Sequence, residues 1–177
     1  MSLIVAIDAG VGGAIAFLDF NGNLLNVEDM PIDEVQVGRN MRKRVSDVRL
    51  LALLDGMKGG HAFIERPEGR PMRSRNKATG QIEMRQPGAA GMLAFGESFG
   101  IARCACVAKG LTLTEARPGE WKRAMGVPGD KQECRRRASE LFPAFAPLFA
   151  RVKDDGRAEA AIFALWGRRQ IQGVKLT

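Results

Sequence analysis

The stretch L-I-V-A-I-D-A-G-V-G-G-A-I-A-F, residues 3–17, decides the fold. Five apolar residues, Leu3 to Ile7, run directly into Asp8, and a glycine-rich turn separates them from a second apolar run. An unbroken apolar run this short, bounded by a turn, predicts a strand buried on both faces in the middle of a sheet. Asp8 would then stand at the strand end, beside glycines that let a bulky anionic ligand approach the backbone. The pattern is compatible with a metal or phosphate site, and it fits equally a carboxylate that only opens a hairpin turn.

Antiparallel strands should follow the first strand as a meander. The pair Asn21-Gly22 lies between the apolar runs 13–20 and 23–30, where an Asn-Gly pair is the strongest short signal of a hairpin. Residues 33–45 are polar and then basic, without strong periodicity, and we expect a loop or ribbon at the sheet margin. Its basic positions are Arg39, Arg42, Lys43 and Arg44.

A second acid, Glu65, stands at the end of a predicted strand, as Asp8 does. After a predicted helix that Ser46 caps and Gly59-Gly60 stops, the stretch H-A-F-I-E-R-P predicts a short apolar strand ending at Glu65. A crossover through the helix would bring this strand parallel to the first one, about 4.8 Å away across the ladder. The two carboxylates would then share one crevice.

A basic segment, residues 66–90, follows Glu65 directly and has no periodic pattern. Loops this long inside a compact domain are usually functional or disordered, and a basic one beside the acids would suit a phosphate backbone. An ordinary solvated loop is the other interpretation. The basic residues are Arg66, Arg70, Arg73, Arg75, Lys77 and Arg85.

The remaining chain predicts a long helix over about residues 89–108, a strand over 111–115, a short helix after Pro118 and a helix from about residue 131 to Pro143. Gly96 and Gly100 lie one turn apart in the long helix and permit close approach of another backbone. That backbone belongs either to the sheet or to a second copy of the chain.

The stretch D-D-G-R-A-E-A opens the last predicted helix. If this helix starts near Asp155, that residue and Glu159 share one face, while Asp154 falls on a neighbouring one. Like charges at this spacing repel unless a cation lies between them. The alternative is that Asp155 caps the helix and Glu159 is a surface residue.

Composition narrows the class of protein. The 177 residues carry 27 Lys plus Arg against 20 Asp plus Glu, a net charge of +7, and the pI is near 9.8. Such a balance indicates a polyanionic partner, most often nucleic acid, although some soluble proteins are simply basic. Three cysteines without C-x-x-C spacing and one histidine disfavour a zinc site and fit a reducing cytosol.

We expect one domain, residues 1–177, in a soluble cytoplasmic protein that a bacterium, or a phage in a bacterial host, encodes. No apolar run approaches the roughly 20 residues of a membrane span, and the start of the chain lacks the basic residues of a signal peptide.

The acids together predict a metal site. Asp8, Glu65, Asp155 and Glu159 offer only oxygen ligands, which select hard divalent ions, Mg²⁺ or Mn²⁺. Four carboxylates suffice for two such ions, one activating water and the other stabilising the leaving oxygen of a phosphodiester. A basic protein around an acidic metal site has the charge arrangement that a nuclease requires.

The predicted order of elements resembles the α/β ribonuclease H-like fold, a mixed five-stranded sheet of three antiparallel and then two parallel strands flanked by helices. More narrowly, the chain resembles RuvC-type Holliday junction resolvases, above all their phage and organellar members. Four stretches across the chain carry the resemblance: I-V-A-I-D-A-G-V-G-G-A-I-A, F-I-E-R-P, A-R-P-G-E-W-K-R-A-M-G-V-P-G-D-K and D-D-G-R-A-E-A.

The resemblance implies a homodimer that resolves four-way DNA junctions by paired symmetric cuts. By it Asp8, Glu65, Asp155 and Glu159 match the catalytic metal-binding acids. Lys122 and Lys131 match basic residues near the scissile phosphate, where a lysine stabilises developing charge; they also fit two solvated lysines on a basic face. With Arg135 they join the candidate nucleic-acid-binding residues.

One departure affects the closing helix. Bacterial members have D-x-x-D there, whereas this chain has the four-residue spacing of the organellar relatives, and Asp154 is a possible substitute for Asp155.

Three rival interpretations exist. Another ribonuclease H-like nuclease would cut flaps or RNA–DNA hybrids. A catalytically silent junction-binding protein would use the acids structurally. A fragment of an actin-like ATPase is disfavoured, because the chain holds no second D-x-G strand.

Overall fold

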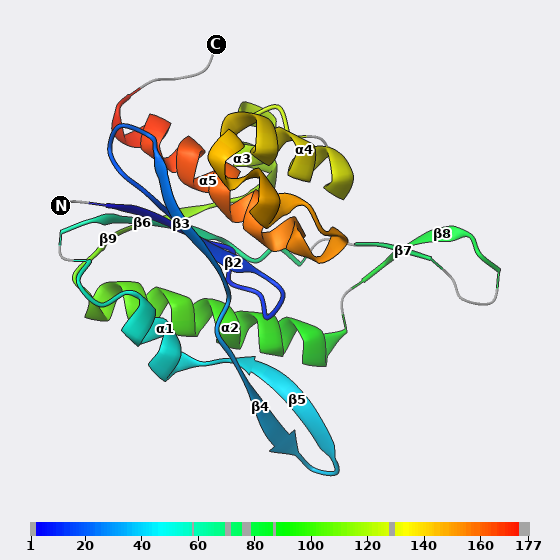
Figure 1. Cartoon of the computed structure of the whole chain (residues 1–177). Coiled ribbons are helices and arrows are strands. Elements are labelled where there is room, and N and C mark those ends of the chain that lie inside the picture. Colours follow the sequence, from blue (N-terminus) through cyan, green and yellow to red (C-terminus); the bar gives the residue numbers. More distant parts are fainter. Residues whose placement is uncertain are drawn as a thin grey trace.

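The computed structural model describes residues 3–57, 59–69, 72–75, 79–86, 88–127 and 130–173. A five-stranded sheet in the order β3-β2-β1-β6-β9 forms its centre (Figure 1). The strands are β1 (Ile4–Ile7), β2 (Ala14–Leu18), β3 (Leu24–Asp29), β6 (His61–Glu65) and β9 (Thr112–Ala116).

The sheet is mixed, as the sequence predicts. Strands β1, β2 and β3 form the antiparallel meander, with Gly22 at a φ of 94° in the turn that joins β2 and β3. β6 pairs parallel to β1 on one side and parallel to β9 on the other. All four residues of β1 are fully buried, which confirms it as the central strand.

Helices cover both faces of the sheet (Figure 1). One face carries α1 (Asp47–Leu53) and α2 (Ala89–Ala108). The other carries α3 (Pro118–Ala124), α4 (Lys131–Leu141) and α5 (Asp155–Ile171), with the 3-10 turns η1 (Pro143–Phe149) and η2 (Val152–Asp154) before α5.

Alternate residues of β1 supply two hydrophobic cores, because side chains alternate across a strand. Ile4 and Ala6 pack toward α5, and Val5 and Ile7 pack toward α1 and α2. α5 lies close to the sheet through Gly167, where a Cβ would come within 2.4 Å of the Phe63 ring. The first turn of α5 lies against the turn after β1, where a Cβ on Gly156 would come within 2.6 Å of the Gly12 carbonyl oxygen.

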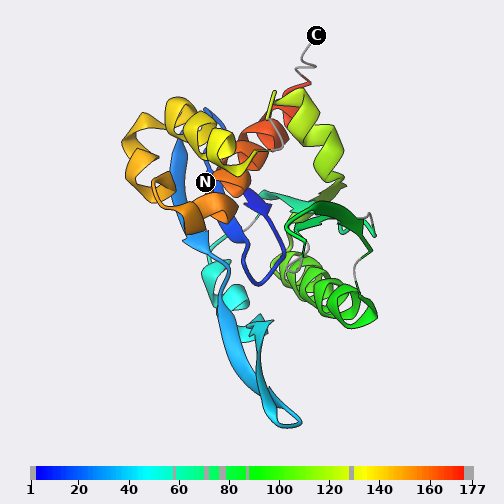
Figure 2. The same ribbon diagram turned by 90° about the vertical axis from the view of Figure 1, so that its right-hand side faces the viewer.

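Two hairpins extend from the sheet-and-helix body in different directions (Figures 1 and 2). The first, β4 (Ile32–Val37) with β5 (Asn40–Val45), is the ribbon form of the segment predicted as a loop or ribbon. The second, β7 (Met72–Arg75) with β8 (Ile82–Arg85), lies in the basic segment where no regular structure was predicted. The sequence analysis therefore missed this second hairpin.

α2 corrects another expectation. An 18-residue window of this 20-residue helix is apolar enough to cross a membrane, although the sequence analysis found no such run. In the structure α2 packs along the sheet and against α1 with one side only. Only 22% of the window is buried, and Leu93 and Val107 are exposed on the outer side.

Candidate active site at the strand ends

Asp8 and Glu65 end neighbouring parallel strands. The register pairs Ile7 with Ile64, so the two acids follow directly at the same edge of the sheet. The glycine turn holds Asp8 in place: a Cβ on Gly13 would lie 2.0 Å from the Asp8 carbonyl oxygen and 2.9 Å from its Cγ. Only glycine fits there, which explains physically why the turn after the first strand is built from small residues.

The carboxyls of Asp8 and Glu65 both have pKa values above their usual range. Burial, followed by the charge of Glu159, raises the pKa of Asp8 to about 6 against a weaker lowering by the Gly10 backbone N–H. Burial, followed by the charge of Asp8, raises the pKa of Glu65 to about 7. Ionising both groups is therefore unfavourable without a nearby positive charge. A divalent cation would supply that charge.

Trp121 on α3 positions Glu65. Its indole Nε1–H donates to Glu65 Oε2 at 2.8 Å, and the ring is fully buried against Phe163, 5.2 Å between centroids. Sequence reasoning missed this contact, because the two residues are 56 positions apart. The available signal was general: a buried tryptophan usually finds an acceptor for its N–H.

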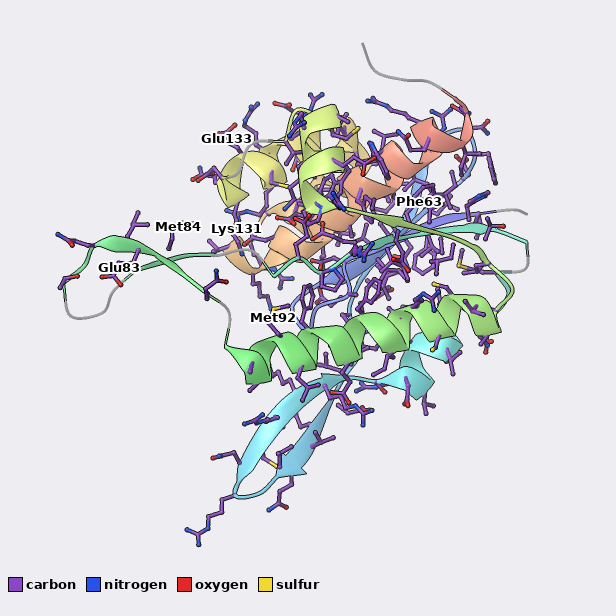
Figure 3. All side chains as sticks on the ribbon, turned by 180° about the vertical axis from the view of Figure 1, so that it is seen from behind. Phe63, Glu83, Met84, Met92, Lys131 and Glu133 are labelled. Carbon is purple, nitrogen blue, oxygen red and sulfur yellow. The ribbon has the colours of Figure 1, made fainter. Side chains whose placement is uncertain are left out.

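Two lysines, Lys122 and Lys131, form ion pairs with acids of the site. Lys122 Nζ donates to Glu159 Oε2 at 2.8 Å and lies 5.2 Å from the centre of the Trp121 ring. Burial lowers the pKa of Lys122, but the charge and the hydrogen bond of Glu159, together with the charge of Glu65, more than offset it, so the net pKa is raised and the ammonium stays charged. Lys131 Nζ lies 3.1 Å from Asp155 Oδ2, and Figure 3 shows Lys131 where α4 meets the start of α5.

Arg135 on α4, a candidate nucleic-acid-binding residue, is largely buried. Its side chain is only 13% exposed, forms an ion pair with Asp155 and donates to the Val152 carbonyl at 3.3 Å. The residue turns inward because Asp155 occupies the adjoining first turn of α5. In this arrangement Arg135 holds Asp155.

A pocket of about 380 Å³ opens between these groups. It is lined by Asp8, Gly12, Lys131, Lys153, Asp155, Gly156 and Glu159. The two glycines let the start of α5 approach the turn after β1, since a Cβ on Gly156 would meet the Gly12 carbonyl oxygen at 2.6 Å. Three of the four predicted acids thus border one cavity, and Glu65 adjoins Asp8.

Asp154 lies outside this pocket. It is 1% exposed, and its carboxylate accepts hydrogen bonds from the Arg151 backbone N–H at 2.9 Å and from the Arg151 guanidinium Nη2 at 2.9 Å. These bonds hold the pKa of Asp154 below its usual range. Its oxygens are already used, which leaves Asp155 as the acid of this pair that faces the cavity.

The basic segment after Glu65 has no described contact with the acids. Arg66 is exposed just beyond β6. Arg73, Arg75 and Arg85 lie on the β7–β8 hairpin, and for these three residues the structure describes only the backbone. Arg70 and Lys77 lie outside the described residues.

The donor chemistry of the site fits Mg²⁺. Among the described residues, no three acid, histidine or cysteine side chains are arranged as a ready metal cage. Mg²⁺ needs none, because it is usually bound through one or two carboxylates together with water and substrate phosphate oxygens. Asp8 and Glu65 provide two such carboxylates, whereas Glu159 and Asp155 would first have to exchange their basic partners for the ion.

Comparisons with known proteins show the fold. No family model matches the sequence, and no curated protein does. The chain is similar to a Thermus thermophilus RuvC in complex with a Holliday junction substrate, at 13% identity and a TM-score of 0.56, over 95% of this chain and 96% of that one. It is also similar to a second Thermus thermophilus RuvC structure, at 15% identity and a TM-score of 0.50, with the same coverage. The chain therefore has a RuvC-like, ribonuclease H-like fold.

Proposed function

We propose that this protein is a metal-dependent endonuclease that resolves four-way DNA junctions by paired, symmetric phosphodiester hydrolysis. One observation carries the proposal: two carboxylates of raised pKa end adjacent parallel strands, within reach of two lysines. The fold supports it, because one structural neighbour is a RuvC bound to a Holliday junction substrate. The net charge of +7 supports a polyanionic substrate.

The residues that would hold Mg²⁺, or Mn²⁺ in its place, are Asp8 and Glu65, joined by Asp155 and Glu159. When bound, such ions supply an activated water and stabilise the charge on the leaving oxygen. Asp155 is proposed here in preference to Asp154, because Asp154 is paired with Arg151 and lies outside the pocket.

The chain's own cations would act on the phosphate. Lys122 remains protonated at neutral pH, so its role is to stabilise negative charge, not to accept a proton. Its ammonium bonds Glu159 in this structure, and a phosphoryl oxygen entering the pocket would offer it a second acceptor. Trp121 orients Glu65 by donating its N–H to one of the two carboxylate oxygens, and this bond leaves the other oxygen unoccupied.

The proposal includes a homodimer through the outer face of α2. Leu93 and Val107 are exposed there, and a Cβ added to Gly96 or Gly100 would meet nothing within 4 Å. Glycine inside a helix destabilises it by about 1 kcal/mol relative to alanine, and nothing in the described chain needs these two. A second copy, crossing closely at these glycines, accounts for them and places two sites around a two-fold axis, as a symmetric junction requires.

Cleavage of a labelled four-way junction tests the proposal. The protein and its Asp8→Asn variant are compared on the junction, a duplex, a flap and an RNA–DNA hybrid, with and without Mg²⁺. We expect paired nicks confined to the junction, dependent on metal and absent from the variant. If only flaps or hybrids are cut, the protein is another ribonuclease H-like nuclease with that substrate. If the junction is bound but not cut in either Mg²⁺ or Mn²⁺, the protein is a catalytically silent junction-binding protein.

Sedimentation of Gly100→Leu tests the dimer surface. The added side chain enters open space in one copy, so the fold should keep its melting temperature while the dimer dissociates. An unchanged dimer would place the interface elsewhere.

A further inference from the structure

We propose that the β4–β5 hairpin, residues 32–45, is a second DNA-binding surface that contacts the phosphates of a duplex arm beyond the cutting site. This inference rests on the proposed function for its substrate class, and it concerns residues outside the pocket at the strand ends.

The outer part of the hairpin does not serve the hydrophobic core. Val45 is 1% exposed at its base, whereas every residue from Gln36 to Arg44 is exposed. Val37 is 47% and Met41 60% exposed. A two-stranded hairpin is at best marginally stable alone in water, and exposed apolar side chains lower its solubility. Core packing therefore gives no reason for extending the hairpin this far.

Charge on the hairpin is segregated toward its tip. Residues 35–45 hold four basic side chains and no acidic one. The two acids of the hairpin lie nearer the base: Asp33 accepts from Arg49 at 2.5 Å, and Glu34 stands opposite Lys43 in the ladder. Within the described residues, Arg39 and Arg42 take part in no ion pair. The tip thus presents unneutralised guanidinium groups, which suit phosphate oxygens.

The hairpin has a fixed direction relative to the site. Arg44 Nε lies 3.0 Å from Glu97 Oε1 on α2, and Arg49 on α1 donates to the Ile32 carbonyl. At the base, the Met30 backbone N–H donates to the Gly13 carbonyl at 3.0 Å, in the turn that holds Asp8. The hairpin therefore begins beside the turn that holds Asp8. Figures 2 and 3 show it extending away from the sheet-and-helix body.

These dimensions suit duplex DNA. Six residues per strand span about 20 Å, because a strand rises about 3.4 Å per residue. That length corresponds to roughly six base pairs, and a two-stranded ribbon fits the major groove. A second copy of this chain is a poorer occupant, because each copy carries a net charge of +7 and the hairpin tip is basic.

Binding as a function of salt and DNA arm length tests the inference. The variant Arg39→Ala/Arg42→Ala is compared with Arg103→Ala/Lys109→Ala, which also removes two positive charges but at the far end of α2, where both residues pair with acids. On junctions with long arms, we expect the hairpin variant to bind about tenfold more weakly, with a slope of log K against log salt shallower by about 2. The control and Arg39→Lys/Arg42→Lys should bind like wild type.

Shortening the junction arms to about five base pairs should make hairpin variant and wild type equal, since the DNA no longer reaches the tip. Equal affinity and equal salt slope on long arms would overturn the inference. So would a change in sedimentation or melting temperature large enough to explain the loss of binding, since the hairpin would then serve assembly or stability.

Failure of the proposed function is distinguishable from failure of this inference. A wild-type protein that never cuts, yet binds long-armed DNA tenfold better than the hairpin variant does, refutes the endonuclease and supports the hairpin surface. A wild-type protein that cuts junctions, together with a hairpin variant that binds them as well as wild type does, supports the endonuclease and refutes the hairpin surface.

Discussion

Asp8 and Asp154 are two carboxyls in one fold with opposite electrostatics. Asp154 is almost completely buried, yet its pKa is lowered, because Arg151 supplies both a backbone N–H and a guanidinium. Asp8 keeps partial access to solvent, yet its pKa is raised to about 6 by burial and by the charge of Glu159. Burial alone therefore does not distinguish a structural acid from a functional one.

The difference lies in what compensates the charge. The Asp154–Arg151 pair is satisfied within the chain, so it contributes stability and has no capacity left for a ligand. The Asp8–Glu65 pair is held by strand register and the glycine turn in spite of its mutual repulsion. Such an uncompensated pair beside a pocket is typical of a functional site. The following predictions test this contrast, from the largest expected effect to the smallest.

Removing the charge of Asp8 should have the largest effect, and it should fall on activity. Asp8→Asn is expected to reduce the rate of junction cleavage about 10³-fold or more, the equivalent of several kcal/mol of lost transition-state stabilisation. The free energy of unfolding without metal at pH 8 should not fall, because one of two repelling charges is gone. Single-turnover cleavage and urea denaturation measure the two effects. A large loss of stability together with activity would make Asp8 a structural residue.

The reciprocal change, Asp154→Asn, should act on stability instead. It removes a buried carboxylate with charge-assisted hydrogen bonds, so we expect a loss of about 3 kcal/mol in the free energy of unfolding. Cleavage per folded molecule should stay within about threefold of wild type, since this acid lies outside the pocket. Denaturation in urea gives the first number and an active-site-normalised rate gives the second. A stable but inactive variant would show that Asp154 takes the role proposed for Asp155.

The pH dependence of stability should separate the same two acids. Asp8 and Glu65 have folded pKa values above their unfolded values of 3.8 and 4.5, so the stability they contribute is complete below about pH 4 and is lost as pH rises through 6 to 7. Asp154 has a lowered pKa, so its contribution is present above pH 3.8 and is lost only in stronger acid. Without metal, the free energy of unfolding should fall by about 2 kcal/mol between pH 4.5 and 7.5 from the titration of Asp8 alone, and further from that of Glu65.

Denaturation curves across that range, with EDTA present, check the slope. Asp8→Asn should flatten it and Asp154→Asn should leave it unchanged. A stability that rises steadily from pH 4.5 to 7.5 would contradict the raised pKa values.

The smallest effect concerns the residue that orients Glu65. Trp121→Phe keeps an aromatic ring against Phe163 but removes the N–H that bonds Glu65. Loss of such a supporting hydrogen bond typically weakens metal binding about tenfold. Calorimetric titration with Mn²⁺ measures it. Trp166→Phe is the matched control, since that ring belongs to the same aromatic group but forms no hydrogen bond to an acid among the residues that the structure describes. Equal affinities for the two variants would reduce Trp121 to a packing residue.

Sequence patterns predicted the sheet because its signals are local. The apolar run ending at Asp8, the Asn21-Gly22 turn and the strand ending at Glu65 each depend on a few neighbouring residues, and the structure has all three. The parallel pairing of β1 and β6 followed from one rule of chain connection. The proximity of Asp8 and Glu65 was therefore predictable, whereas their raised pKa values required the burial that only the fold supplies.

Long-range and weakly patterned features could not be predicted in the same way. The β7–β8 hairpin was missed because each of its strands is only four residues long, too short for an alternating pattern to stand out. The Trp121–Glu65 bond joins residues with no sequence relation, and the inward turn of Arg135 depends on how α4 packs against α5. The choice between Asp154 and Asp155 depends on the bonds that Arg151 makes with Asp154. The spacing of Arg151 from the two acids does not indicate in the sequence which of them it pairs with.

The most direct test of the central claim, that the strand-end carboxyls bind a divalent cation, is the melting temperature at pH 7.5 with and without Mg²⁺ or Mn²⁺. A ligand that binds only the folded state at 100 times its Kd stabilises that state by about 2.7 kcal/mol. We predict that wild type and Asp154→Asn are stabilised by the metal, whereas Asp8→Asn and Glu65→Gln are not. Equal stabilisation of all four proteins, or stabilisation of none, would contradict the claim.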